Sequence, residues 1–519
     1  MRMRKIFFLA ALGLSTMIQA AELDFYKTLV DEQKDATKGT TQLYNLEYAA
    51  DGSLYLTSMY QTADTSEVGL IFDGQTYKGG TAAKWKDLKI TNYRNSFLAK
   101  LDAEGNLLWA KADTTGDYDM SNTAIAVTND GGVIYADKFR GRRGNYMSYF
   151  NVYNANGQLV ASNNMSFTNY DSILVDGKNV KRKDAFSWAG AAMDKDSFVY
   201  IAGLQGDTLL PTWNDSIAPR KAWNTKGSLS SNCNTVILKY KAQYNQFMDL
   251  DYVGYVINND ELVYDRPLGL HYENGKLYVA GTYSNGTESG IYAACYNTNL
   301  EREYIKYNAI KGSLQFQQTK FVDGKILVCG GLAKGGSITI GNKIVVASET
   351  ANNSGLVYVM NMANGEALDA AVNVPETNPL NITVAAFPTD SGYIAYNHET
   401  LNGVQLALNY DENLNLVSID TLAQGGGSST VSVVGRNADG SKTALGLRAR
   451  SNAPYNLLNE EPMQFETTNW YSVVAVLKSN GSTEGVENTK INSDKAVKFI
   501  QNGQLFIRHN GRIYNVLGF

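Results

Sequence analysis

The chain is poor in proline, cysteine and histidine, and each shortage excludes a class of protein. Its 519 residues include 8 Pro, 3 Cys and 3 His. Three cysteines cannot build the dense disulfide framework of small exported domains, although a single bridge stays compatible with them. His271, His398 and His509 lie far apart in the chain, in no spacing typical of metal ligands. We therefore expect neither a disulfide scaffold nor a histidine metal centre.

Helical periodicity and long apolar runs are also missing. No segment keeps the 3.6-residue period of an amphipathic helix together with recognisable caps. Beyond the N-terminus, no stretch approaches the ~18 apolar residues that a membrane-spanning helix needs. A helical domain and a transmembrane segment are therefore not expected.

Motifs for catalysis and for nucleic-acid binding are absent as well. The sequence contains no G-x-S-x-G, no H-E-x-x-H and no cysteine with a histidine partner. The formal net charge is −5, and the basic clusters at 140–143 and 181–183 carry no interleaved aromatic residues. Nucleic acid and anionic membranes are thus poor partners.

No residue is predicted to be catalytic or to bind a metal. The turn at Asp194-Lys195-Asp196-Ser197 places two carboxylates at alternate positions, as calcium loops do. It lacks the glycine and the distal glutamate of such a loop, so a plain β-turn is the simpler interpretation. Apart from structural calcium bound by turns, we expect no cofactor.

Residues that favour strands and tight turns are abundant. The chain has 33 Tyr and 47 Gly, and aromatic residues make up 11% of it. Tyrosine and β-branched residues are typical of strands, and glycine beside aspartate or asparagine is typical of tight reversals. The composition therefore predicts an all-β fold.

One unit recurs along the chain. Its inner hairpin is clearest at 44–60 (YNLEYAADGSLYLTSMY), and its outer hairpin at 96–111 (SFLAKLDAEGNLLWAK). Further inner hairpins are predicted at 123–139, 189–205, 268–284, 318–333, 383–399 and 430–450. Further outer hairpins are predicted at 149–162, 236–249, 292–304, 357–368 and 406–419. Such recurrence is typical of a radially repeated all-β architecture.

The last unit is one strand short. Only the first strand of its outer hairpin is present, at 471–477, while a lone strand at 23–30 has no partner nearby. Pairing these two strands would close a ring and remove its exposed edges. We therefore predict a seven-bladed β-propeller closed by the N-terminal strand, with six or eight blades still compatible with the faint copies.

Both ends of the chain differ from the repeats. Residues 1–20 have a basic start, an apolar run and small residues near Ala20, as in a secretory signal peptide. We assign 21–481 to the propeller and 482–495 to a polar linker. Residues 496–519 predict a three-stranded meander, because Asn502-Gly503 and Asn510-Gly511 are strong hairpin signals.

These residues carry two family resemblances. SFLAKLDAEGNLLWAK, the preceding GLIFDGQTYKGG and the segment SITIGNKIVVASE resemble the SBBP-type β-propeller repeats of bacterial secreted proteins. NGQLFI and IYNVLG resemble the C-terminal sorting tails of the Bacteroidetes type IX secretion system. The resemblances imply export to the outer-membrane surface or the medium of a Gram-negative bacterium, and they imply no activity. A tail that docks on the propeller is the alternative.

Four inserts lengthen one face of the predicted ring, at 61–95, 206–234, 334–354 and 451–469. Long loops on a rigid scaffold commonly hold binding sites. The aromatic candidates on them are Trp85, Trp213, Trp223, Trp470, Tyr77 and Tyr93. Such rings stack on sugars or anchor a protein partner, and they equally serve to fold loops onto a scaffold.

We therefore expect an exported or surface-displayed protein that binds a glycan or a protein partner without catalysis. A polysaccharide lyase or glycosidase is the alternative, because its acid and base can come from distant blades. A structural subunit of a surface assembly is a third hypothesis.

Overall fold

The computed structural model describes residues 22–31, 40–62, 69–78, 93–112, 124–140, 146–167, 172–175, 178–181, 186–205, 209–211, 216–217, 234–244, 250–258, 264–285, 287–373, 381–399, 403–425, 430–450, 454–458, 470–478, 497–501, 504–509 and 512–515. The chain divides into two compact units, Met1–Ser479 and Asn480–Phe519, which are treated separately. The residues described contain strands and no helix, which confirms the all-β class. In these ranges there is accordingly no helix that could span a membrane.

The first unit consists of four-stranded antiparallel groups. Groups 1 to 6 are each built from two hairpins in succession, and group 7 takes its fourth strand from the N-terminal part of the unit. Group 1 contains β2 (Thr40–Tyr48), β3 (Leu54–Thr62), β6 (Tyr93–Leu101) and β7 (Leu107–Ala112). Group 2 contains β8 (Ala124–Val127), β9 (Val133–Arg140), β10 (Tyr146–Tyr153) and β11 (Leu159–Phe167). Group 3 contains β14 (Phe186–Met193), β15 (Phe198–Gln205), β17 (Asn234–Tyr244) and β18 (Leu250–Ile257).

The later groups repeat this order. Group 4 contains β19 (Tyr264–Glu273), β20 (Lys276–Ser284), β21 (Ser289–Asn297) and β22 (Arg302–Ala309). Group 5 contains β23 (Leu314–Val322), β24 (Lys325–Ala333), β27 (Asn353–Asn361) and β28 (Ala367–Asn373). Group 6 contains β29 (Asn381–Thr389), β30 (Gly392–Glu399), β31 (Val404–Asp411) and β32 (Leu416–Gly425). Group 7 contains β33 (Thr430–Arg436), β34 (Lys442–Arg450), β36 (Trp470–Lys478) and β1 (Glu22–Asp31).

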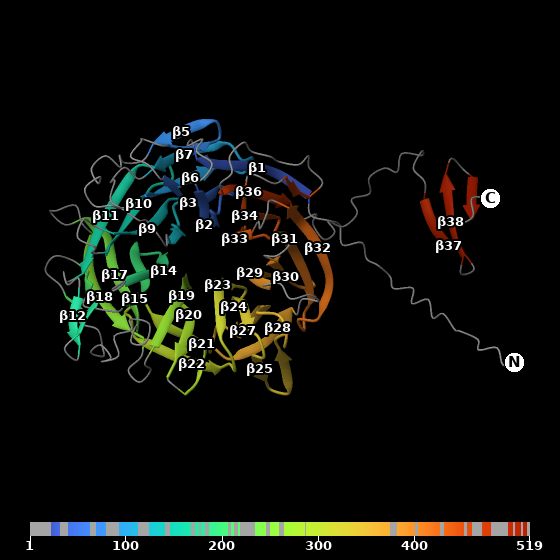
Figure 1. The fold of residues 1–519 in the computed structure, drawn as a ribbon. Helices are drawn as coiled ribbons and strands as arrows, with labels where there is room; N and C mark the ends of the chain where they lie inside the picture. The colour runs from blue at the N-terminus through green and yellow to red at the C-terminus, as the bar shows by residue number, and fades with distance from the viewer. Residues whose placement is uncertain are drawn as a thin grey trace. The chain divides into compact units, whose positions relative to one another are not determined.

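The groups are arranged around a common centre (Figure 1). The first strand of each group contacts the first strand of the next group, and β33 contacts β2 to complete the circle. One parallel pairing, of Thr40 with Trp470, also joins groups 7 and 1 into a single ten-stranded sheet. The apolar core lies between neighbouring groups, as in the cluster of Tyr200, Ile237 and Leu277 from groups 3 and 4.

The N-terminal strand completes the last group, as the sequence predicts. β1 pairs antiparallel with β36, with Leu23 opposite Leu477 and Leu29 opposite Ser472. The Asp24 carboxylate lies 2.7 Å from the Lys442 ammonium and 2.6 Å from the Lys478 ammonium. The strand is therefore held by its ladder of hydrogen bonds and by two ion pairs.

The outer turn, between the third and fourth strands of a group, has a recurring construction. In group 1, the Asp102 carboxylate accepts hydrogen bonds from the backbone N–H groups of Glu104 and Asn106, at 3.0 and 2.7 Å. Equivalent caps are Asn154, Asn297 and Asp411. The residue three positions after each cap has positive φ, at Gly105, Gly157, Leu300 and Leu414. The asparagine and aspartate of the repeat thus set the tight reversals.

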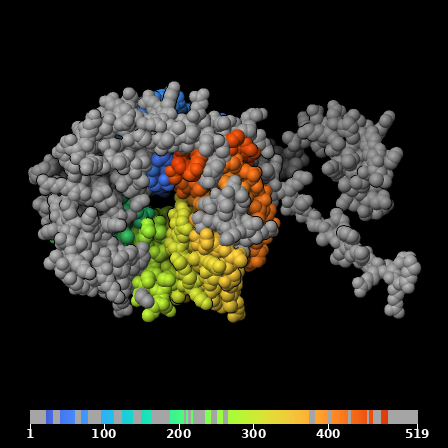
Figure 2. Space-filling view, viewed as in Figure 1, coloured from blue at the N-terminus to red at the C-terminus, as the bar shows by residue number. Residues whose placement is uncertain are grey.

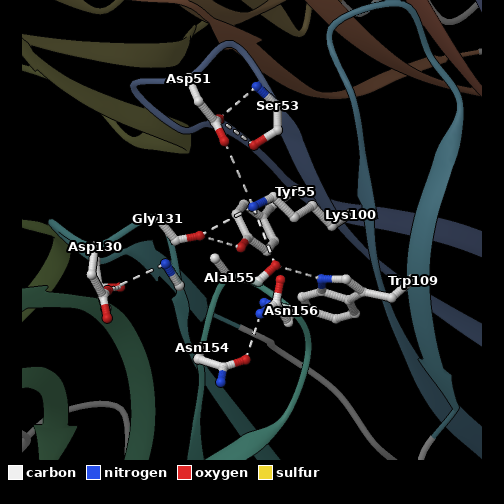
Figure 3. A network of polar contacts seen from close by, with 12 residues as sticks. Asp51, Ser53, Tyr55, Lys100, Trp109, Asp130, Gly131, Asn154, Ala155 and Asn156 are labelled. Atoms are coloured by element: carbon white, nitrogen blue, oxygen red, sulfur yellow. Dashed lines mark hydrogen bonds and ion pairs between the residues drawn. The ribbon is translucent and has the colours of Figure 1, made fainter.

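Polar contacts tie group 1 to the turns of group 2 (Figure 3). The Lys100 side chain, in a residue only 2% exposed, donates to the carbonyls of Gly131 and Ala155 at 3.2 and 3.4 Å. The Tyr55 hydroxyl donates to the Gly131 carbonyl at 2.6 Å, and Trp109 Nε1–H donates to the Ala155 carbonyl at 3.0 Å. These donors satisfy carbonyls at the junction between the groups.

The same junction recurs around the ring. Ala155 is the second residue of its outer turn. In three other outer turns, the backbone carbonyl of the second residue also accepts a hydrogen bond from a side chain of the preceding group. The pairs are Lys442 to Ala103, Lys239 to Thr298 and Tyr304 to Met362, at 2.5, 2.6 and 2.6 Å. The pair from group 7 to group 1 shows that the closing junction also has a donor on this turn carbonyl, here from the second strand of its group rather than from the third or fourth.

The remaining strands of the first unit lie in the connections. They are β4 (Gly69–Phe72), β5 (Gln75–Lys78), β12 (Ser172–Val175), β13 (Lys178–Lys181), β16 (Leu209–Leu210), β25 (Ser337–Ile340), β26 (Lys343–Val346) and β35 (Tyr455–Leu457). In the second unit, β37 (Val497–Gln501), β38 (Gln504–His509) and β39 (Arg512–Asn515) form the antiparallel meander that the sequence predicts.

Candidate functional site

The predicted inserts all join the second strand of a group to its third, at one end of the strands, which we call the looped face. They belong to groups 1, 3, 5 and 7. Three of them add a strand to the outer edge of the preceding group: β4 pairs with β1, β16 with β11 and β35 with β32. The described parts of these inserts therefore cover sheet edges, a structural role that the sequence left as the alternative to binding.

Four of the six predicted aromatic candidates cannot be assigned contacts. Trp85, Trp213 and Trp223 lie outside the described residues. Tyr93 is the first residue of β6, and its side chain lies outside the described part. Tyr77 lies in β5, where its ring packs edge-on against Phe97 with centroids 5.1 Å apart. This contact fixes the β4–β5 hairpin on group 1.

Trp470 is the predicted candidate whose surroundings suit a ligand. It is the first residue of β36 and is partly exposed at the looped face. The guanidinium carbons of Arg448 and Arg450 lie 4.5 and 4.8 Å from the centroid of its ring. Arg448 also donates to the Thr40 hydroxyl at 2.7 Å, and Arg450 is exposed. Two cations and an indole therefore share one place where groups 7 and 1 meet.

A second constellation, which the sequence did not single out, lies inside the ring at the opposite end. There the first and second strands of each group join, and we call this the hairpin end. Three residues lie in the same layer of this end, each in the third cross-strand residue pair counted from the turn of its hairpin: His271, Lys320 and Phe387. The ring of His271 stacks on Phe321 with centroids 5.5 Å apart. The Lys320 ammonium lies 5.6 Å from the centroid of Phe387.

Glu47 faces this layer from group 1. Its carboxylate accepts a hydrogen bond from the Val127 backbone N–H and interacts electrostatically with the Lys320 ammonium. Glu47 and Lys320 are each only partly exposed to solvent, and both are surrounded by protein atoms. The space-filling view is hollowed at the centre of the ring (Figure 2). Strands of groups 1 and 5 therefore contribute opposite charges to one interior region.

Burial shifts the ionisation of these groups. It raises the pKa of the Glu47 carboxyl to about 7, although the Lys320 charge and the Val127 hydrogen bond act in the opposite direction. It lowers the pKa of the Lys320 ammonium, against the attraction of Glu47. The pKa of His271 is also lowered by burial. At neutral pH the layer thus holds a carboxyl close to its titration midpoint beside an amine and a neutral imidazole.

This arrangement differs from the pair of carboxylates that a glycosidase needs. Among the described residues, no second carboxylate influences the ionisation of Glu47. Nor do the described ranges contain a group of three side chains suited to hold a metal. At the Asp194 turn, one carboxylate oxygen accepts the N–H groups of Asp196 and Phe198, and the other accepts the Tyr200 hydroxyl. These contacts are those of a capped β-turn.

The sequence could not reveal the interior layer. Glu47 and Lys320 are single polar residues in inner strands 273 positions apart, and only the closure of the ring brings their strands to the same interior. A charge near the turn does not mark the layer by itself, because Glu273 of β19 and Arg436 of β33 also lie at the ends of first strands.

Comparisons with known proteins give no family. No protein-family model matches the chain, and no curated protein matches it. Solved structures with partial similarity include a europium-containing methanol dehydrogenase, at 9% identity and a TM-score of 0.38, covering 84% of this chain and 93% of that one. A Bacillus megaterium levansucrase mutant matches at 11% identity and a TM-score of 0.32, covering 67% and 91%. A Trypanosoma rangeli sialidase matches at 10% identity and a TM-score of 0.33, covering 73% and 57%. Similarity at this level carries no conclusion about activity.

Proposed function

We propose that the first unit is a seven-bladed β-propeller that binds an acidic glycan at its looped face, without catalysis. The blade number is supported by the seven groups in the described residues and by the matching contacts of group 7 with group 1. The binding function is carried by one observation, the position of Trp470 beside Arg448 and Arg450.

The chemistry of these residues favours an anionic sugar over a neutral one. Guanidinium groups bind carboxylate and sulfate through paired hydrogen bonds, and a planar indole offers its surface to the C–H groups of a sugar ring. Both guanidinium groups lie on β34 and the indole lies on the neighbouring strand β36, so little ordering is needed on binding. Exposed Arg450 is the residue that would meet the acid group first.

Binding to an array of neutral, uronic-acid and sulfated glycans tests this function. We expect binding to acidic members that weakens as salt is raised, because the attraction is electrostatic. Arg450→Ala should reduce affinity about 5- to 50-fold, a range typical for loss of one charge-assisted contact. Lys306→Ala, a change at an exposed lysine on group 4, is the matched control. Preference for neutral glycans, or equal binding by the Arg450 variant, would contradict the proposal.

We further propose that the chain is exported and that the second unit acts as a sorting tail for the outer-membrane surface. The support is the signal-like N-terminus and the resemblance of the C-terminal meander to type IX tails. Mass spectrometry of the exported protein tests both statements. A mature chain beginning near Ala21 and ending near Lys495 is expected, whereas retention of the meander on the secreted protein would argue that it is a docked part of the fold.

A further inference from the structure

A row of polar contacts joins the N-terminal strand to the residues around Trp470. The Thr41 hydroxyl, in a fully buried residue of β2, donates to the Leu29 carbonyl of β1 at 3.0 Å. The same hydroxyl lies 3.1 Å from the Ser472 hydroxyl of β36. Strands β1, β2 and β36 therefore meet at one buried side chain, which holds β2 against both of the others.

The adjoining residues belong to the glycan site. The first residue of β2, Thr40, pairs with Trp470 and accepts a hydrogen bond from Arg448 at 2.7 Å. Arg448 lies opposite Ser472 in the pairing of β34 with β36, and Leu29 lies opposite Ser472 in the pairing of β1 with β36. The guanidinium and the N-terminal strand are thus on strands that flank the same residue.

Departure of β1 would disturb this site. It would take the Leu29 carbonyl away from the Thr41 hydroxyl, and a buried hydroxyl that loses its acceptor is costly. The start of β2 would then shift, because the contacts of Thr41 fix it. Thr40 lies in that segment and accepts the hydrogen bond of Arg448, so the guanidinium would lose a contact that orients it beside the indole.

We propose that docking of β1 and binding of an acidic glycan at Trp470 are coupled, so that the site is complete only when the N-terminal strand closes the ring. This inference rests on the function proposed above and adds what regulates it. Thr41 is a positioning residue, because it contacts the closing strand and not the ligand. A ligand that binds only the closed ring lowers release of β1 by the factor 1 + [L]/Kd, which is about tenfold at a concentration about nine times Kd.

Hydrogen exchange of the full chain, followed by mass spectrometry, tests the coupling. The probe is a heparin octasaccharide, which carries both sulfate and carboxylate groups. Exchange at residues 23–29 should slow about tenfold at a probe concentration about nine times Kd, whereas exchange in β20 and β21 of group 4 should not change. Binding of the probe without slower exchange in β1 would overturn the inference and leave the glycan-binding function standing.

A substitution away from the ligand tests the positioning role. Thr41→Val keeps the shape of the side chain and should weaken binding of the probe about 3- to 30-fold, whereas Thr41→Ser should restore it. The matched control is Thr443→Val, at a buried threonine near the other end of β34, whose hydroxyl accepts from Tyr396 at 3.3 Å. This control should lose stability and keep wild-type affinity. Equal affinity of Thr41→Val and the wild type would contradict the coupling.

A comparison without ligand decides the coupling by itself. Arg448→Met removes the bond to Thr40 and should speed exchange at residues 23–29 by about 3- to 10-fold. Arg450→Met removes the other cation beside the same indole and should leave this exchange unchanged, because Arg450 is exposed at the end of its strand. Equal exchange in the Arg448 variant and the wild type would overturn the inference. If the probe fails to bind while this difference is seen, the glycan-binding function alone is wrong.

Discussion

Single residues in the outer turns decide how neighbouring groups pack. The residue with positive φ is glycine at positions 105 and 157, and leucine at 300 and 414. A Cβ on Gly157 would lie 2.6 Å from the ring of Trp109, and one on Gly105 would lie 2.7 Å from Phe25. Leu414 instead has its own side chain buried in the core between groups 5 and 6. The junction is thus filled either by an aromatic ring over glycine or by leucine itself.

Gly157→Ala should lower the free energy of unfolding by about 2–4 kcal/mol, from strain at positive φ plus displacement of the Trp109 ring. The matched control is Gly324→Ala, which has φ of 68° and open space around its Cβ. It should cost only about 1 kcal/mol, the backbone part alone. Urea unfolding of both variants measures the difference, and equal losses would mean that Trp109 is free to move aside.

Glu47 should make stability depend on pH. Its pKa is raised from 4.5 to about 7 on folding, so the unfolded chain ionises first as the pH rises. The stability that this carboxyl contributes is complete below pH 4.5 and is lost as the pH rises to 7. Relative to wild type, Glu47→Gln should therefore gain about 1–3 kcal/mol between pH 5 and pH 8. Urea unfolding at both pH values tests this, with exposed Glu104→Gln as the control that should not change.

At the scale of the element, the hairpins follow from local sequence. The inner hairpins predicted from alternation and from Asp, Asn and Gly turns coincide with pairs of strands in the structure, and so do most outer hairpins, because turn chemistry acts over four or five residues. The hairpin predicted at 236–249 ends too early, since its second strand, β18, begins at Leu250. The packing of one group against the next cannot be predicted from local sequence in this way. It depends on which carbonyl of one group meets which donor of the next, and no pattern within one hairpin contains that information.

The lysine at the junction of groups is the clearest case. Lys100 is only 2% exposed, in a strand where its neighbours Ala99 and Leu101 are fully buried. The structure explains its presence by its bonds to Gly131 and Ala155 (Figure 3). Sequence reasoning likewise located Trp470 but could not find Arg448 and Arg450 beside it, since that contact arises across strands 20 residues apart.

Lys100→Met should destabilise the ring by about 1–3 kcal/mol, because the methionine keeps the volume but leaves interior carbonyls with fewer donors. Lys306→Met is the control, since its ion pair with Glu366 is at the surface and should contribute about 0.5 kcal/mol or less. Thermal unfolding followed by circular dichroism compares the two. A loss no greater for Lys100 than for Lys306 would show that the junction is held by apolar packing alone.

At the scale of the whole molecule, the closure of the ring depends on the first strand, β1. The sequence predicted this pairing by counting strands rather than by recognising a motif. Deletion of residues 22–31 would expose the full length of β36 as an open edge and remove Phe25 from Gly105. We expect the deleted protein to self-associate and to unfold with reduced cooperativity. A synthetic peptide of sequence ELDFYKTLVD should restore the monomer, as measured by sedimentation. A stable, monomeric deletion protein would show that the remaining strands suffice.

The pairing of Glu22 with Lys478 brings the first and last described residues of the first unit side by side. A short glycine-rich linker between them would therefore span little distance, and new ends could be opened in any exposed connection between groups, such as that after Ile310. Circular permutants of this kind should keep the same sheets in the same order. In this architecture, the fold itself then does not dictate between which groups the chain termini lie.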